Sequence, residues 1–89
     1  MKEFLAKYIS KNFRAKTLAQ LAGIEENILG NYKYQRSGPR AITAVYICKA
    51  LEKAQKRGLI EIDRTGYPNE LSTLDILYID CMKCISREI

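Results

Sequence analysis

The chain has 89 residues, of which 47% are hydrophobic and 28% charged, and its formal net charge is +5. This length gives one small domain, and the apolar content suits a packed core and excludes a disordered chain. No apolar run approaches the roughly 20 residues that span a bilayer, and the first residues lack the apolar stretch of a secretion signal. Three cysteines cannot all pair within one chain, so we expect reduced thiols and a cytoplasmic protein.

The charge divides the chain near Gly58. Residues 1–57 contain twelve Lys and Arg against four Asp and Glu, a net charge of +8, whereas residues 58–89 contain three against six, a net charge of −3. A basic region attracts polyanions whatever their sequence, and an acidic one is repelled by phosphates and better suits a protein partner. The plainer alternative is that the basic residues only keep a small protein soluble.

The first expected helix covers residues 2–13, because apolar residues recur there at helical spacing. These residues are Phe4, Leu5, Tyr8, Ile9 and Phe13. Its basic face would also suit a membrane surface, but its apolar residues are needed to cover the helices that follow. A second, short helix is expected over residues 15–22, and Gly23 ends it where a left-handed residue costs least.

A third helix is expected from about residue 25 to residue 34. Its expected core residues are Ile28, Leu29 and Tyr32. After a loop, Pro39 suits the first turn of a fourth helix that reaches about Arg57, because proline has no amide proton to leave unpaired. This fourth helix is apolar over a broad face, with Ile42 and Tyr46 among its apolar residues, and we expect it to be the central helix of the core.

Residues 59–63 alternate loosely between apolar and acidic side chains, which predicts a short strand or an extended arm. Ser72-Thr73-Leu74-Asp75 matches a capping box and opens a last helix that reaches about residue 87. This helix is apolar around most of its circumference, which is too wide for one packing contact, so we expect it to bind a second copy of the chain. The expected dimer-interface residues are Leu74, Leu77, Tyr78, Cys81 and Ile85.

Residues 18–32 contain the features of two helices joined by a tight turn. Such a pair needs a small residue where the helices cross, a residue that tolerates an unusual backbone in the turn, and apolar residues on either side. The chain supplies Leu18, Ala19, Ala22, Gly23, Ile24, Leu29 and Tyr32 in this order. In these positions it resembles the helix-turn-helix family of the lambda-type repressors and Cro proteins. Residues 38–51 are similar to the next helix of that family, so the resemblance covers about residues 2–57.

The five expected helices make an all-α domain, in which the wide apolar stripe of the last helix predicts that residues 58–89 form the dimerisation arm and helix. The resemblance implies that residues 1–57 of this compact domain bind DNA. It implies a phage or bacterial transcription regulator, such as a repressor, that binds a roughly palindromic operator as a homodimer with its third helix in the major groove. The implied base-contact residues are Glu26, Asn27, Gly30, Asn31 and Tyr34. The implied phosphate-contact residues are Lys16, Thr17, Lys33, Arg36 and Arg40. A plainer interpretation treats these side chains as solvated polar groups or helix-end charges, and Gly30 as a weak point in the helix.

Two features depart from the family. Ala15 stands where the family commonly has a glutamine that binds a phosphate, so Lys16 or Thr17 must replace it. Glu25 and Glu26 place two anions at the end of the helix that would face the groove. These glutamates also suit a rival interpretation, in which the same scaffold acts as an antirepressor or an antitoxin and binds a regulatory protein or a toxin. An antitoxin would contact its toxin through the acidic C-terminal third and would still bind DNA.

The cysteines form no convincing metal motif. Cys81 and Cys84 are spaced as CxxC, but structural zinc needs four ligands, and the chain has only three cysteines and no histidine. They are better interpreted as small apolar residues, with a redox-sensitive thiol as the alternative. Without His, and without Ser or Cys beside a base, the common catalytic triads are excluded, and no nucleotide-binding motif is present. We therefore expect neither an enzyme nor a cofactor.

Overall fold

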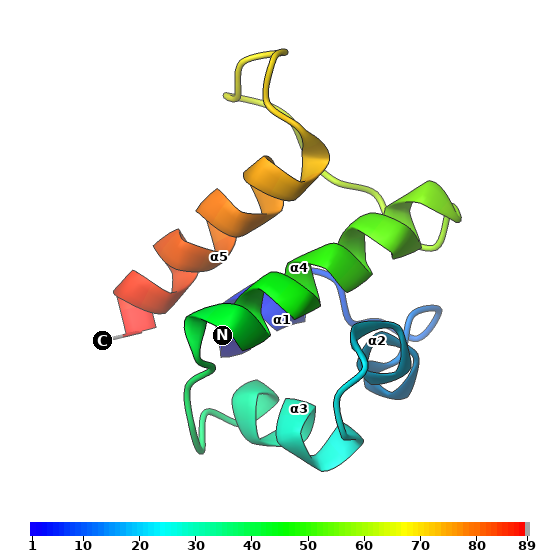
Figure 1. Ribbon diagram of the computed structural model, residues 1–89, viewed down its shortest axis with the longest axis vertical. Coiled ribbons are helices and arrows are strands. Elements are labelled where there is room, and N and C mark those ends of the chain that lie inside the picture. Colours follow the sequence, from blue (N-terminus) through cyan, green and yellow to red (C-terminus); the bar gives the residue numbers. More distant parts are fainter. Residues whose placement is uncertain (89) are drawn as a thin grey trace.

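The computed structural model describes residues 1–88, and over these residues the chain is all-α (Figure 1). It forms five helices and no strand within this range: α1 (Lys2–Ala6), α2 (Ala15–Ala22), α3 (Glu26–Lys33), α4 (Ala41–Lys56) and α5 (Thr73–Glu88). The predicted fold of five helices is therefore confirmed. Ile89, which ends the predicted dimerisation segment, lies outside the described residues.

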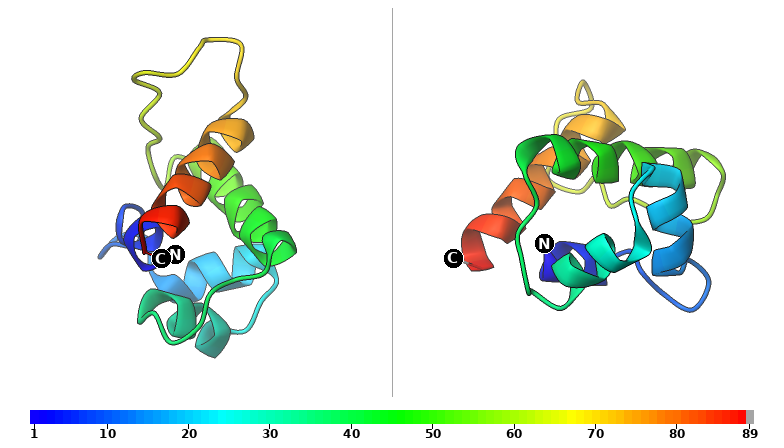
Figure 2. Two further views of the ribbon diagram at one scale, coloured as in Figure 1. Left: turned by 90° about the vertical axis from the view of Figure 1, so that its left-hand side faces the viewer. Right: turned by 60° about the horizontal axis from the view of Figure 1, so that its bottom comes forward.

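α4 is the central helix of the core, as predicted. It packs against both α2 and α5, and Figure 2 shows α4 and α5 side by side with α2 and α3 beneath them. Mostly small residues at helical spacing form its buried face, which lets the neighbouring helices approach closely. They are Ala44, Ile47, Cys48, Ala50, Leu51 and Ala54. Phe4 and Phe13 add the aromatic bulk of the core, and each buried large apolar side chain contributes about 1.5–3 kcal/mol.

The first helix is much shorter than predicted. α1 ends at Ala6, and the chain then forms a turn in which the Ser10 amide donates to the Phe13 carbonyl at 2.9 Å. The Ser10 hydroxyl accepts a hydrogen bond from the Asn12 amide at 3.2 Å. A serine side chain that binds the nearby backbone competes with helix formation. Phe13 is buried all the same, so the apolar spacing predicted the burial correctly but not the helix.

Of the two alternatives predicted for residues 59–63, the strand is wrong and the arm is present. In the described part of the chain this segment is an irregular connection between α4 and α5, without a neighbouring strand to which it could pair. Ile60 and Ile62 are half-buried against the helical core. The apolar residues of this alternating segment therefore mark the side of an irregular arm that packs against the helical core.

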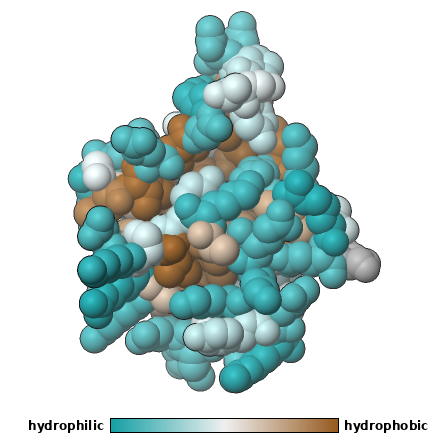
Figure 3. Space-filling model, turned by 180° about the vertical axis from the view of Figure 1, so that it is seen from behind, coloured by the Kyte–Doolittle hydropathy of each residue, from teal (hydrophilic) through white to brown (hydrophobic). Residues whose placement is uncertain are grey.

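Three apolar residues lie at the surface although the helical pattern predicted them in the core. Ile28 is 36% exposed, because the buried side of α3 lies between Leu29 and Tyr32, away from it. Ile42 and Tyr46, one turn apart on α4, are 59% and 46% exposed, because the two neighbours of α4 leave its outer side uncovered. Seen from behind, hydrophilic side chains cover most of the surface, with apolar residues visible between them (Figure 3).

The last helix begins as predicted. The Ser72 hydroxyl accepts a hydrogen bond from the Asp75 amide at 3.1 Å, which caps the first turn of α5. The helix packs against both α1 and α4, so most of its wide apolar stripe is covered within the chain. Leu77 and Cys81 are 0% exposed, which leaves no surface on which a second copy could contact them. This corrects the predicted dimer interface at these two residues.

The other predicted interface residues of α5, Leu74, Tyr78 and Ile85, are half-buried.

Pro39, predicted in the first turn of the fourth helix, lies just before that helix, because α4 begins at Ala41 after Arg40.

Among residues 1–88 no helix is both long and apolar enough to cross a membrane.

Two ion pairs tie the short helix α1 and the residue after it to α5. The Lys7 ammonium lies 2.9 Å from both carboxylate oxygens of Asp80, and the Arg87 guanidinium lies 3.2 Å from Glu3. The hydrogen bond that Lys7 donates to Asp80 raises the pKa of Lys7 above its usual 10.5. From neutral pH to about pH 10.5 the contribution of the first pair is therefore fully present, and it is lost as the pH rises through the raised pKa of Lys7.

We expect Asp80→Asn to lower the free energy of unfolding at neutral pH by about 0.5–1 kcal/mol, since Lys7 is partly exposed and water screens the pair. Urea unfolding followed by circular dichroism measures this loss. The control is Glu52→Gln, which breaks an exposed pair with Lys56 within α4 and should cost no more than about 0.5 kcal/mol. A smaller loss in Asp80→Asn than in the control would contradict a role for Asp80 in fastening the N-terminal segment.

Candidate nucleic-acid interface

A tight turn joins α2 to α3. Gly23 has a φ of +71°, in the left-handed region, and the Ile24 amide donates to the Ala19 carbonyl at 3.1 Å. This arrangement is a common glycine end of a helix. α3 then runs transverse to α2, as the views in Figures 1 and 2 show. The two helices and the turn predicted around Gly23 are therefore present.

The apolar residues expected to fix these helices lie in the interior. Leu18, Ala19 and Leu29 are buried completely or almost so, and Tyr32 is buried nearly as well. Ala22 and Ile24 are half-buried against the same cluster. Because these residues fill the space beneath both helices, the outer side of α3 is left for other contacts.

The outer side of α3 brings the predicted base-contact residues together. Gly30 and Asn31 lie three and four residues after Asn27, and Tyr34 lies four and three residues after them, which places the four on one face of the helix. Asn27 is exposed, Tyr34 is 63% exposed, and Gly30 and Asn31 are half-exposed. Glu26 is also exposed and, with Asn27 and Tyr34, lines a shallow hollow of about 510 Å³ that reaches Ala15 at the start of α2.

The predicted phosphate-contact residues come from three helix ends. Lys16 and Thr17 are exposed in the first turn of α2, and Arg40 is exposed just before α4. Lys33 and Arg36 lie at the end of α3. Their cationic groups are 5.6 and 5.7 Å from the centre of the Tyr34 ring, within the range of cation–π attraction. The exposed tyrosine thus gathers two cations beside the outer face of α3.

The backbone after α3 turns sharply to place Arg36. Gln35 has a φ of +61°, a left-handed conformation that is uncommon for a residue other than glycine. The Arg36 amide then donates to the Asn31 carbonyl at 2.8 Å, which closes the end of α3. This closing hydrogen bond fixes the direction in which the chain leaves the helix.

The starts of α2 and α4 are unusually positive. Each follows an arginine, Arg14 or Arg40, and in the described chain neither start has a side-chain cap or an acidic residue in its first turn. A helix start already carries partial positive charge and unpaired amides, so an arginine there adds like charge that a bound anion would offset. The sequence prediction missed Arg14, although its position directly before a helix start was a usable signal.

The two glutamates at the start of α3 are both exposed. Glu25 is the residue before the helix, and Glu26 lies in its first turn. Negative side chains stabilise this end of a helix by about 0.3–1 kcal/mol. Their position therefore has a structural explanation, although they still oppose the approach of phosphates to this end of α3.

The chain was compared with protein-family models, with curated proteins and with solved structures, and none of the three comparisons gives a match. The resemblance to the lambda-type repressors and Cro proteins therefore stays a prediction.

Alanine substitutions at two glycines test the left-handed turn, because both glycines have free space around them and differ in backbone conformation. A Cβ added at Gly23 or at Gly30 meets nothing within 4 Å, but Gly23 has a φ of +71° and Gly30 lies within α3. We expect Gly23→Ala to lower the free energy of unfolding by about 1–2 kcal/mol because of backbone strain. We expect Gly30→Ala to raise it by about 0.5–1 kcal/mol, since alanine suits a helix better. Chemical unfolding of both variants measures the difference, and the same sign for both would contradict the left-handed turn.

Proposed function

We propose that the protein is a sequence-specific DNA-binding transcription regulator that inserts α3 into the major groove of an operator as a homodimer. The observation that carries this proposal is the outer face of α3, where accessible amide and phenol side chains lie beside the cations at the end of the same helix, with further cations at the starts of α2 and α4. The amides are Asn27 and Asn31, and the cations are Arg14, Lys16, Lys33, Arg36 and Arg40.

The chemistry of these groups suits DNA. The major groove is about 12 Å wide and admits one helix, and an asparagine amide can donate to and accept from an adenine edge at the same time. Lysine and arginine contacts to phosphates, together with the free amides at the start of α2, would fix the position of α3 without reading sequence. By occupying promoter DNA, the protein would then repress or activate transcription.

The outer side of α5 supports the dimer. Tyr78, Ile79 and Met82 are half-buried and line a shallow groove on this side. Asp75 lies four residues before Ile79, and Lys83 lies four residues after it. If two copies of α5 pair antiparallel about Ile79, each Asp75 faces the Lys83 of the other copy, as a two-fold interface requires. The proposed contact is therefore this outer side, in place of the buried Leu77 and Cys81.

The proposed DNA contacts separate into two kinds of variant. We expect Arg36→Ala to weaken binding to all duplexes and to reduce the slope of log affinity against log salt by about 1, because a phosphate contact releases about one counterion. We expect Asn27→Ala to weaken binding to the operator by about 1–3 kcal/mol while leaving random DNA nearly unchanged. Gel shifts at two salt concentrations, with the upstream region of the protein's own coding sequence and a random duplex as probes, measure both effects.

The control for the DNA variants is Lys56→Ala, which removes one positive charge, as Arg36→Ala does, but from the exposed end of α4, which the proposal places in neither contact. It should leave the affinity of a single α3 for random DNA unchanged, measured with a half-site duplex. Absence of a shift by the unmodified chain at low salt would contradict the DNA proposal. That result would favour the rival, binding of a protein partner, for which Glu25, Glu26 and the exposed Ile42 and Tyr46 are the available surface.

The dimer can be tested by exchanging charges. We expect Asp75→Lys and Lys83→Asp each to weaken dimerisation roughly tenfold or more, because each places like charges opposite one another. The double variant should recover most of the loss, since the pair is restored with its charges exchanged. Sedimentation equilibrium at several concentrations measures the constants. Monomers at all concentrations for the unmodified chain, or a double variant weaker than both single ones, would rule out the antiparallel contact.

A further inference from the structure

Three cysteines lie in the interior of the protein, away from the proposed DNA-binding residues. Cys48 belongs to α4, and Cys81 and Cys84 belong to α5. All three are free thiols with 0% exposure. The CxxC spacing in the sequence singles out Cys81 and Cys84 as a pair, but the fold relates the three thiols differently.

The packing of α4 on α5 brings Cys48 and Cys81 together. The two helices have 16 residues each, lie side by side and run in opposing directions (Figures 1 and 2). Helices of equal length in this arrangement meet near their middles, and Cys48 and Cys81 are the residues near the middle of each. Their thiols form a hydrogen bond inside the core.

The proton in this contact lies with Cys48. Its thiol donates to the sulfur of Cys81, and this hydrogen bond raises the pKa of Cys48 and lowers the pKa of Cys81. The thiolate is the nucleophile in cysteine chemistry. Cys81 is therefore the sulfur that reacts first with an electrophile, and Cys48 is placed to attack it next.

Cys84 has a different partner. Its sulfur accepts a hydrogen bond from the Arg87 guanidinium at 3.2 Å, and Arg87 also pairs with Glu3 of α1. Cys84 lies one turn beyond Cys81 on the same helix and is equally buried. It is therefore a matched control for any reaction of the other two thiols.

We propose that Cys48 and Cys81 are an oxidation site, which a hydroperoxide converts to an intramolecular disulfide that locks α5 onto α4. This inference does not depend on the proposed binding of DNA.

The reaction has two steps. The Cys81 thiolate attacks one peroxide oxygen, the O–O bond breaks, and Cys81 becomes a sulfenic acid. The other oxygen leaves and takes up a proton, as an alcohol or, from hydrogen peroxide, as water. The Cys48 sulfur then attacks the Cys81 sulfur, the S–S bond forms, and the hydroxyl group leaves as water with the proton of Cys48. The two thiols lose two electrons in all, and the hydroperoxide gains them.

The position of the pair determines what the bond does. Because both sulfurs are fully buried, an oxidant reaches them only when α5 moves off α4. The connection between the helices, residues 57–72, is irregular and permits this movement. Once the disulfide has formed, α5 can no longer separate from α4. Oxidation therefore captures a transient opening and then prevents it.

Oxidation of the full chain with hydrogen peroxide under native conditions, followed by mass spectrometry, tests the pairing. Remaining thiols are alkylated before digestion, and trypsin cleaves after Lys83, so each cysteine falls in its own peptide. These peptides cover residues 41–49, 65–83 and 84–87. We expect the first two peptides joined by a disulfide and an alkylated Cys84. A disulfide that contains Cys84, a link between two chains, or three alkylated thiols would overturn the proposal.

The same oxidation in urea separates a pairing set by the fold from one set by the thiols alone. In the unfolded chain the contact between α4 and α5 is absent, and closing the short segment between Cys81 and Cys84 costs less entropy than closing the long one from Cys48. We expect a mixture of pairings there. The same single product with and without urea would contradict an origin in the fold.

Variants test the order of the two steps. Cys84→Ala should form the disulfide within about twofold of the rate of the unmodified chain. In Cys48→Ala the sulfenic acid of Cys81 should persist and react with dimedone, whereas Cys81→Ala should leave Cys48 unlabelled. Circular dichroism shows whether each variant is folded, and peptide mapping of the unmodified chain does not depend on any of them. Dimedone on Cys48 alone would refute the assignment of Cys81 as the first sulfur.

Thermal unfolding tests the lock. A disulfide restricts the unfolded chain, so the oxidised protein should unfold roughly 8 °C or more above the reduced protein. Dithiothreitol should restore the lower midpoint. An unchanged or lower midpoint after oxidation would show that the bond does not hold α5 on α4.

Discussion

The structure depends on the burial of α4 along much of its length. Small residues at helical spacing, such as Ala44, Ala50 and Ala54, let α2 and α5 approach the same central helix. A domain of this size buries only about two thirds of the surface of its unfolded chain, so it has little stability to spare and needs this close contact. α2 is thereby fixed, and through the turn at Gly23 so is α3. The orientation of the outer face of α3 is therefore set by the packing of α4. Only Arg40, just before α4, belongs to the candidate interface itself.

Much of the fold was predictable because helix period and stop signals are local. Gly23 and Ser72 fixed boundaries within one or two residues. The errors came from interactions that the pattern does not encode. The Ser10 hydroxyl diverts the backbone before α1 can extend, and Ile60 and Ile62 alternate along an arm that packs on helices. Periodicity also treats every apolar residue as core, whereas Ile42 and Tyr46 face the uncovered side of α4.

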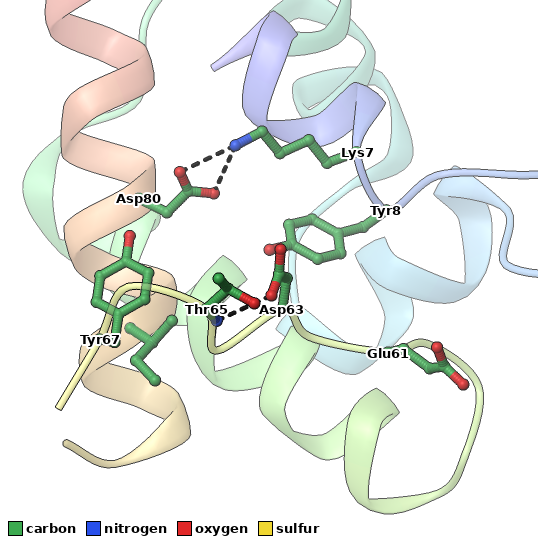
Figure 4. A pocket seen from close by; sticks show the side chains of 8 residues that line it. Lys7, Tyr8, Glu61, Asp63, Thr65, Tyr67 and Asp80 are labelled. Carbon is green, nitrogen blue, oxygen red and sulfur yellow. Dashed lines mark hydrogen bonds and ion pairs between the residues drawn. The ribbon is translucent and has the colours of Figure 1, made fainter. Parts of the chain in front are cut away.

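Surface residues differ in the same way: those within one helix could be predicted from the sequence, and groups from distant segments could not. The outer face of α3 could be predicted residue by residue, because Asn27, Asn31 and Tyr34 belong to one helix and one period. The hollow lined by Tyr8, Asp63 and Asp80 joins three distant segments, so no spacing in the sequence predicts it (Figure 4). Charge is likewise divided in space: cations lie on α2, α3 and before α4, and carboxylates lie around this hollow.

The link between α1 and α5 has a consequence for how the protein is made. A helix of five residues is not stable alone, and α1 packs on α5 and on α3. The Asp80 that binds Lys7 and the Arg87 that binds Glu3 are synthesised long after α1. The support beneath α3 is thus incomplete until α5 has been made. A chain cut before α5 would keep the cations of α2 and α3 but lose part of the packing that holds α3 in place.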